Sequence, residues 1–182
     1  MTLFSLSSIS ILAGTLAIAV RLPGVLAPAT FRSAAIKLPR NVPIGRILMG
    51  LVAAIVWWVM YHAATDEWKW AQPLIFIGVP VAYLLVANFG TQYLTLRAVA
   101  ALLLLIAKQM IDAADASLAP GRLVVTVVAY LWVVTAIWMT VAPHHFRDLL
   151  GFLMANDRRC RLACSAGIVV GLALVVLGVF VY

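Results

Sequence analysis

Six long apolar stretches constrain this chain more than any other feature, because a soluble fold has no interior large enough to hold them. A helix needs about 20 residues to cross a bilayer core of about 30 Å. We expect membrane-spanning helices over residues 3–22, 44–64, 73–89, 94–117, 121–142 and 161–182, the third being the shortest. The sequence thus predicts an all-α integral membrane protein with a single polytopic domain over residues 1–182.

The composition points the same way. Hydrophobic residues make up 65% of the 182 positions and charged residues only 10%. Soluble domains are about half apolar and about a quarter charged. So little charge could not cover so much apolar surface in water, and lipid is the expected solvent.

Basic residues are concentrated in alternate connections between the apolar stretches. Ten of them fall in or beside the first, third and fifth connections, and two in the others. Cytoplasmic connections carry such an excess, so we expect both termini outside, with a bacterial inner membrane as the best fit. The net charge of +7 is then explained by orientation and by anionic lipid headgroups at the cytoplasmic face, and no nucleic-acid motif accompanies it. The ten residues are Arg21, Arg32, Lys37, Arg40, Arg46, Arg97, Arg147, Arg158, Arg159 and Arg161.

Two connections carry their own structural signal. After Pro143, apolar residues recur at helical spacing on one face, which predicts an amphipathic interfacial helix over about 143–155. In the first connection, prolines confine any helix to about 28–37. Aromatic residues around the second connection predict an interfacial belt on the outer side. They are Trp57, Trp58, Tyr61, Trp68 and Trp70.

The first and fifth connections also match each other without gaps at an offset of 115 residues. Ala27-Pro28-x-x-Phe31-Arg32 corresponds to Ala142-Pro143-x-x-Phe146-Arg147, and seven of the twenty positions over 27–46 are identical. We expect the first and last pairs of spanning helices to be parallel repeats, with the middle pair a shorter hairpin. The alternative is coincidence in an apolar chain.

The shared motif has an architectural interpretation. Pro28 and Pro143 end regular hydrogen bonding where the chain leaves the bilayer. The following Phe anchors the interface, and the adjacent Arg meets lipid phosphate. A second matched arginine, Arg46 or Arg161, caps the cytoplasmic end of the next helix.

The C-terminal hairpin, over about 142–182, resembles a family of small two-span bacterial inner-membrane proteins of unknown function. The residues that carry the resemblance are Pro143, Phe146, Arg147, Asp157, Arg161, Gly167 and Gly171. The resemblance implies a fold element and no activity.

The fourth apolar stretch contains the best candidate site. Only ten apolar residues, 98–107, precede Lys108, so a spanning helix must continue through Lys108, Gln109, Asp112 and Asp115. Lys108, Asp112 and Asp115 then share one face, with Lys108 about 16 Å from Arg97 along the axis. Charges at this depth usually mark a cavity or pathway. The alternatives are an intrahelical Lys108–Asp112 pair and snorkelling of Lys108.

Other polar features are weaker. His62 and the pair His144 and His145 fall on opposite sides of the membrane, so they cannot share one haem. Cys160 and Cys164 are one helical turn apart, and free thiols are favoured over a metal pair. Small residues at four-residue spacing in the last helix predict close helix packing, within the chain or against a second copy or a partner. They are Ala163, Gly167 and Gly171.

No phosphate-binding loop, nucleophile elbow or HExxH motif is present in the sequence. We therefore expect no catalytic residue, no metal and no cofactor. The favoured function is a non-catalytic scaffold, assembly factor or accessory subunit of a membrane complex. The alternative is a small transporter or channel for ions, protons or solutes that uses the polar face around Lys108, and a membrane-embedded enzyme ranks third.

Overall fold

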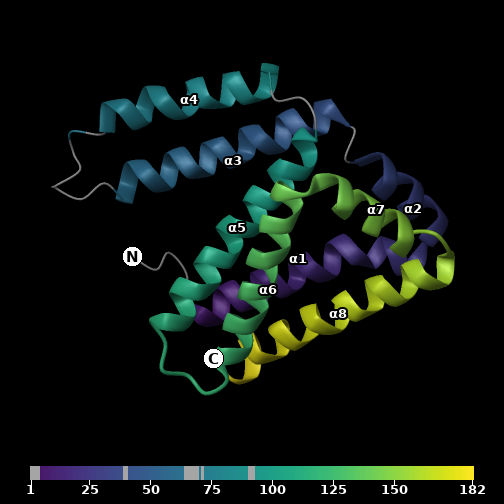
Figure 1. Ribbon diagram of the computed structural model, residues 1–182. Helices are drawn as coiled ribbons and strands as arrows, with labels where there is room; N and C mark the ends of the chain where they lie inside the picture. The colour runs from purple at the N-terminus through teal and green to yellow at the C-terminus, as the bar shows by residue number, and fades with distance from the viewer. Residues whose placement is uncertain (1–4, 39–40, 64–69, 71, 90–92) are drawn as a thin grey trace.

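The computed structural model describes residues 5–38, 41–63, 70, 72–89 and 93–182, which form eight α-helices and no strand (Figure 1). Five of these helices are long and apolar enough to cross a membrane, namely α1, α3, α5, α6 and α8. Helix α4 is also apolar but shorter, as the sequence predicts for residues 73–89. The bounds are α1 Leu6–Leu26, α2 Pro28–Lys37, α3 Val42–Ala63, α4 Gln72–Phe89, α5 Leu94–Asp115, α6 Arg122–Val141, α7 Pro143–Leu153 and α8 Asp157–Phe180.

The ends of the helices follow from local chemistry and correct two sequence-based bounds. α1 continues through Pro23 to Leu26, four residues beyond the expected end. It ends at Ala27 because the residue before a proline avoids helical angles. α8 begins at Asp157, four residues earlier than expected, after the extended Asn156. An acidic residue suits the first turn of a helix, so the arginines that follow lie inside α8 and not in a connection.

The antiparallel pair of α1 and α8 makes the most extensive helix contact in the described chain. Gly14 and Gly171 lie backbone to backbone, and a Cβ atom placed on Gly14 would lie 2.5 Å from the Gly171 carbonyl oxygen. Near the chain ends, the Ser7 hydroxyl donates to the Gly178 carbonyl oxygen at 2.6 Å. Glycines let the two helices approach this closely because no side chain separates them.

A second pair, α5 and α6, packs on the first at the end of the molecule where the termini lie (Figure 1). The core at this junction joins residues of all four helices, including Ile9, Met110, Val125 and Leu174. Since these side chains are almost fully buried, they fix the two pairs as one body.

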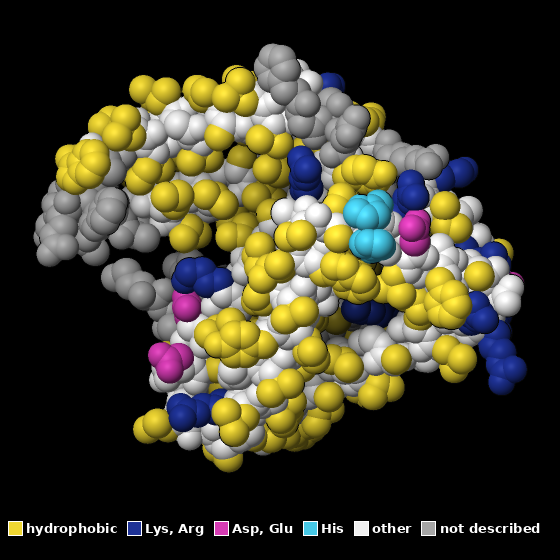
Figure 2. Space-filling view, viewed as in Figure 1, with side chains coloured by type: hydrophobic (Ala, Val, Ile, Leu, Met, Phe, Trp, Pro, Cys, Tyr) yellow, Lys and Arg dark blue, Asp and Glu magenta, His cyan; other side chains and the backbone are white. Residues whose placement is uncertain are grey.

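The hairpin of α3 and α4 extends away from the four other long helices and contacts them through α3, which lies against α5 (Figure 1). Gly45 lies against Thr95 at this contact, and the Thr95 hydroxyl donates to the Asn41 carbonyl oxygen at 2.7 Å. α4 packs on α3 and carries exposed apolar side chains such as Leu74, Phe76 and Ile77. Figure 2 shows hydrophobic side chains spread over this hairpin and much of the remaining surface, as expected in lipid.

The two short helices, α2 and α7, contact each other at the opposite end of the molecule from the termini (Figure 1). The structure places α7 over Pro143–Leu153 and α2 over Pro28–Lys37, close to the two ranges expected. Pro28 and Pro143 are 115 residues apart, as are the first residues of α3 and α8. The preceding alanines also have nearly the same backbone angles, φ −134° and ψ 69° at Ala27 and φ −130° and ψ 65° at Ala142.

Candidate functional site

Lys108 and Asp112 form an ion pair on the outside of α5. They are one turn apart, and the Lys108 ammonium donates to Asp112 Oδ2. The Lys108 side chain is 60% exposed and the Asp112 side chain 35%. The structure thus shows the intrahelical pair that the sequence offered as the alternative to a pathway residue.

The inward face of α5 is apolar over the same turns. Ala107, Met110, Ala113 and Ala114 are all buried there. Gln109 is half-buried and Asp115 is exposed. The predicted polar residues therefore do not line the interior of the helix bundle.

The buried polar side chains of the described residues are those of Ser10 and Thr95, and none of the buried side chains is charged. Thr95 donates to Asn41, whereas the buried Ser10 Oγ has no partner among the described atoms. No three His, Cys, Asp or Glu side chains gather within the part of the chain that the structure describes.

The best-defined polar cluster lies at the other end, where α2 meets the turn between α7 and α8. Arg32 Nε donates to the Met154 carbonyl oxygen at 2.5 Å, and Nη2 donates to that of Ala155 at 2.7 Å. Arg32 Nη1 is 2.6 Å from Asp157 Oδ1. Arg32 therefore joins the two short connecting segments. A guanidinium group can satisfy several acceptors at once, and the expected contact of Arg32 with lipid phosphate stays a prediction.

Arg147, at the corresponding position of α7, is differently placed. It donates through Nη2 to Asp148 Oδ1 at 3.0 Å, with the Arg147 side chain 40% exposed and the Asp148 side chain 62% exposed. The hydrogen bond and charge of Asp148, followed by the Tyr93 hydroxyl, raise the pKa of Arg147 above its ordinary value.

The matched aromatic residues pack inside the protein and not only at an interface. Phe31 lies against a cluster of Met154, Cys160 and Cys164, with the start of α8 beside it. Phe146 packs against the cluster of Leu96, Ala100, Ala136 and Met139 and meets Trp138 edge to face. Each phenylalanine thus closes a different apolar cluster.

The second matched arginines also differ. Arg46 Nε donates to the Ala87 carbonyl oxygen of α4 at 3.3 Å, and the Tyr83 hydroxyl donates back to the Arg46 carbonyl oxygen at 3.4 Å. Arg46 thus joins α3 to the end of α4. Arg161 is exposed on the first turns of α8.

The small residues of α8 pack within the chain. Gly171 faces Gly14 and Ile18, and Gly167 lies under the side chain of Arg21. Ala163, one turn before Gly167, is half-buried. The sequence does not identify α1 as the partner helix, because the spacing of small residues shows which face of α8 is small but not which helix covers it.

Cys160 and Cys164 are buried free cysteines beneath the end of α1. The Cys160 thiol is 3.8 Å from the Gly24 carbonyl oxygen, and a Cβ atom on Gly24 would clash with the Cys164 sulfur. Packing therefore explains this pair.

The aromatic belt and the histidines are only partly described. Trp57 stacks on Tyr61 and meets Phe76 of α4, whereas Trp68 lies outside the described residues. His144 and His145 are exposed neighbours with ring centroids 4.1 Å apart, and the side chain of His62 lies outside the described part.

Comparisons with protein-family models, curated proteins and solved structures found no match to the chain. The resemblance of residues 142–182 to small two-span membrane proteins therefore stays a prediction from its residues.

Proposed function

We propose that the chain is a non-catalytic subunit of a membrane complex, acting as a scaffold, assembly factor or accessory subunit. The observation that carries this proposal is the Lys108–Asp112 ion pair on the outside of α5. It lies within a helix that is apolar and long enough to span a membrane.

An exposed ion pair at this depth is costly in lipid. Insertion scales give about 2.5–3.5 kcal/mol for one charged residue at the centre of a spanning helix, and pairing offsets only part of it. A polar surface on another membrane protein would lower this cost by solvating the pair. We therefore expect the partner to be a different protein whose helix places polar or charged side chains against Lys108 and Asp112.

The interior of the bundle favours a scaffold over an ion pathway through one chain. The buried face of α5 is formed by alanines and Met110, and the described core contains no charged side chain. Among the described buried side chains, an ion crossing that core would meet only the hydroxyl groups of Ser10 and Thr95 in place of its water.

A site-specific crosslink tests the scaffold role. Leu104 is exposed one turn before Lys108 and shares its face, so a photoreactive residue there should give an adduct of one defined mass in native membranes. The same residue at Val169, exposed on α8, is the matched control. We expect the Leu104 adduct to disappear in the Lys108→Leu, Asp112→Leu double variant. Lipid adducts alone at both positions would contradict the proposal.

The runner-up is a transporter or channel that uses the same face of α5. It is favoured by the position of the exposed Lys108 and Asp115 and the half-buried Asp112 on one face of α5, which a second chain could enclose as a pathway. Proton or ion flux in liposomes separates the two functions. Flux by the wild type that is lost in the Lys108→Leu, Asp112→Leu variant would favour transport.

We further propose a bacterial inner membrane, with α4 as a sixth spanning helix and both termini outside. The distribution of basic residues supports this orientation. The shared 115-residue offset of α2 with α7 and of α3 with α8 supports a parallel repeat of two three-helix units, α1–α3 and α6–α8.

A further inference from the structure

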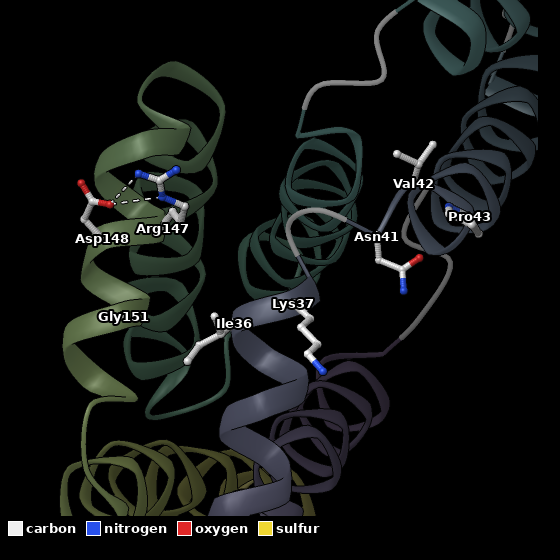
Figure 3. A pocket seen from close by; sticks show the side chains of 8 residues that line it. All are labelled: Ile36, Lys37, Asn41, Val42, Pro43, Arg147, Asp148 and Gly151. Carbon is white, nitrogen blue, oxygen red and sulfur yellow. Dashed lines mark hydrogen bonds and ion pairs between the residues drawn. The ribbon is translucent and has the colours of Figure 1, made fainter.

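A cavity of about 880 Å³ lies between α7 and the corner where α2 meets α3 (Figure 3). Arg147 and Asp148 come from the α7 wall, and Lys37 and Asn41 from the facing wall (Figure 3). Ile36 and Val42 add apolar surface beside these polar groups. Arg147 thus pairs with Asp148 on the α7 wall, and Lys37 places a second cation on the facing wall (Figure 3).

The partners of Arg147 beside the cavity differ from those of its counterpart Arg32. The 115-residue offset makes Arg147 the counterpart of Arg32 and makes Val42 the counterpart of Asp157. Arg32 is held by Asp157 and two carbonyl oxygens. Valine stands in place of that aspartate on the wall opposite α7, and among the described residues the carboxylate partner of Arg147 is its sequence neighbour Asp148.

We propose that this cavity binds the phosphate group of an anionic lipid, held between Arg147 and Lys37. A guanidinium group can donate two parallel hydrogen bonds to phosphate, while a lysine contributes a mobile point charge. Asn41 uses its Oδ1 to accept from the Ile44 amide, so its amide nitrogen supplies a donor on the same wall. The site depends on the residues of the two connecting segments and is independent of the scaffold role.

The phosphate comes from a lipid and not from free phosphate. α2 and α7 connect apolar helices at one end of the molecule, which places the cavity at the level of lipid headgroups. Ile36, 50% exposed, and Val42 offer apolar contact to the glycerol and upper acyl chain. Inorganic phosphate would leave these side chains uncovered, so it should bind more weakly.

Native mass spectrometry on the full chain tests the site, with phosphatidylglycerol as the probe. We expect wild type to retain one phosphatidylglycerol against a large excess of detergent. Arg147→Gln should weaken retention about tenfold. Arg158→Gln is the matched control, because it removes the same charge from an exposed position on α8 and should retain the lipid like wild type.

Two further variants test the chemistry in opposite directions. Val42→Asp supplies the carboxylate that Asp157 gives Arg32, so Arg147 should turn to it and retention should fall at least fivefold. Asp148→Asn removes the competing carboxylate, so retention should rise severalfold. Thermal unfolding in detergent checks that each variant is folded. If Val42→Asp does not fold, Asp148→Asn still tests the proposal.

Three outcomes would overturn the proposal. Equal loss in Arg147→Gln and Arg158→Gln would show attraction by net charge alone. A wild type that retains no phosphatidylglycerol would exclude the site. Displacement of the lipid by millimolar inorganic phosphate would assign the cavity to a free anion.

Discussion

Arg32 and Arg147 hold equivalent positions in α2 and α7, yet Arg32 is bound by Asp157 and two carbonyl oxygens, whereas Arg147 pairs with the adjacent Asp148. One motif therefore gives a closed junction at one corner of the molecule and an open cavity at the other. Residue 157 is aspartate whereas its counterpart, residue 42, is valine, so the carboxylate that binds Arg32 has no equivalent at the other corner.

Arg32→Ala should destabilise the junction between α2 and α8. It removes two hydrogen bonds to carbonyl oxygens, worth about 0.5–1.5 kcal/mol each. The salt bridge adds less, about 0.2–1 kcal/mol, because Asp157 is 55% exposed. We expect the free energy of unfolding in detergent to fall by about 1–3 kcal/mol. Asp157→Asn should cost less than half as much, and an equal or larger loss would contradict the dominant role of the carbonyl contacts.

Gly171→Leu should separate α1 from α8, because a Cβ atom at Gly171 would already lie 2.9 Å from the Gly14 carbonyl oxygen. Overpacking of this kind costs about 1–3 kcal/mol, measured by thermal unfolding in detergent. Gly78→Leu in α4 is the control, since nothing lies within 4 Å of its Cβ position. Similar unfolding temperatures for the two variants would show that α1 and α8 do not pack through glycine.

Cys160 and Cys164 should resist alkylation in the folded protein. Both are buried against Gly24 and Phe31, so a maleimide should react only after unfolding. Mass spectrometry counts the modified thiols. Gly24→Val would push against the Cys164 sulfur and should speed the reaction. Rapid labelling of the wild type would contradict the described packing.

Tyr182 should make stability fall at high pH. Burial raises the pKa of its phenol above 10, and the hydroxyl donates to the Gly121 carbonyl oxygen at 2.8 Å. The folded state therefore favours the neutral phenol. Stability is unaffected below pH 10 and is lost as the pH rises through the raised pKa. In unfolding measured between pH 9 and 11, Tyr182→Phe should lose less stability than wild type, and identical profiles would count against this assignment.

Helix positions could be predicted from the sequence because they depend on local chemistry. Proline after alanine ends α1 and α6, and the run of apolar residues sets the helices between. The Lys108–Asp112 pair was also predictable, since residues four apart on a helix must be neighbours.

Contacts between distant helices could not be predicted in this way. The motif suggested that Arg32 contacts lipid. Sequence spacing does not show that the turn between α7 and α8 lies beside α2, so the contacts of Arg32 with this turn could not be predicted. Likewise, Gly167 and Gly171 indicated a close approach without identifying α1. Such pairings depend on how all the helices pack together, and several packings would satisfy the same apolar pattern.

The proposed topology embeds the long helices in the membrane and places α2 and α7 on the cytoplasmic side. Fusion of a phosphatase that is active only outside the cytoplasm measures this most directly. We predict an active enzyme when it follows Tyr182 and an inactive one when it is inserted at Gly151 in α7. Activity at Gly151 with none after Tyr182 would contradict the orientation and, with it, the lipid headgroups to which the cavity is assigned.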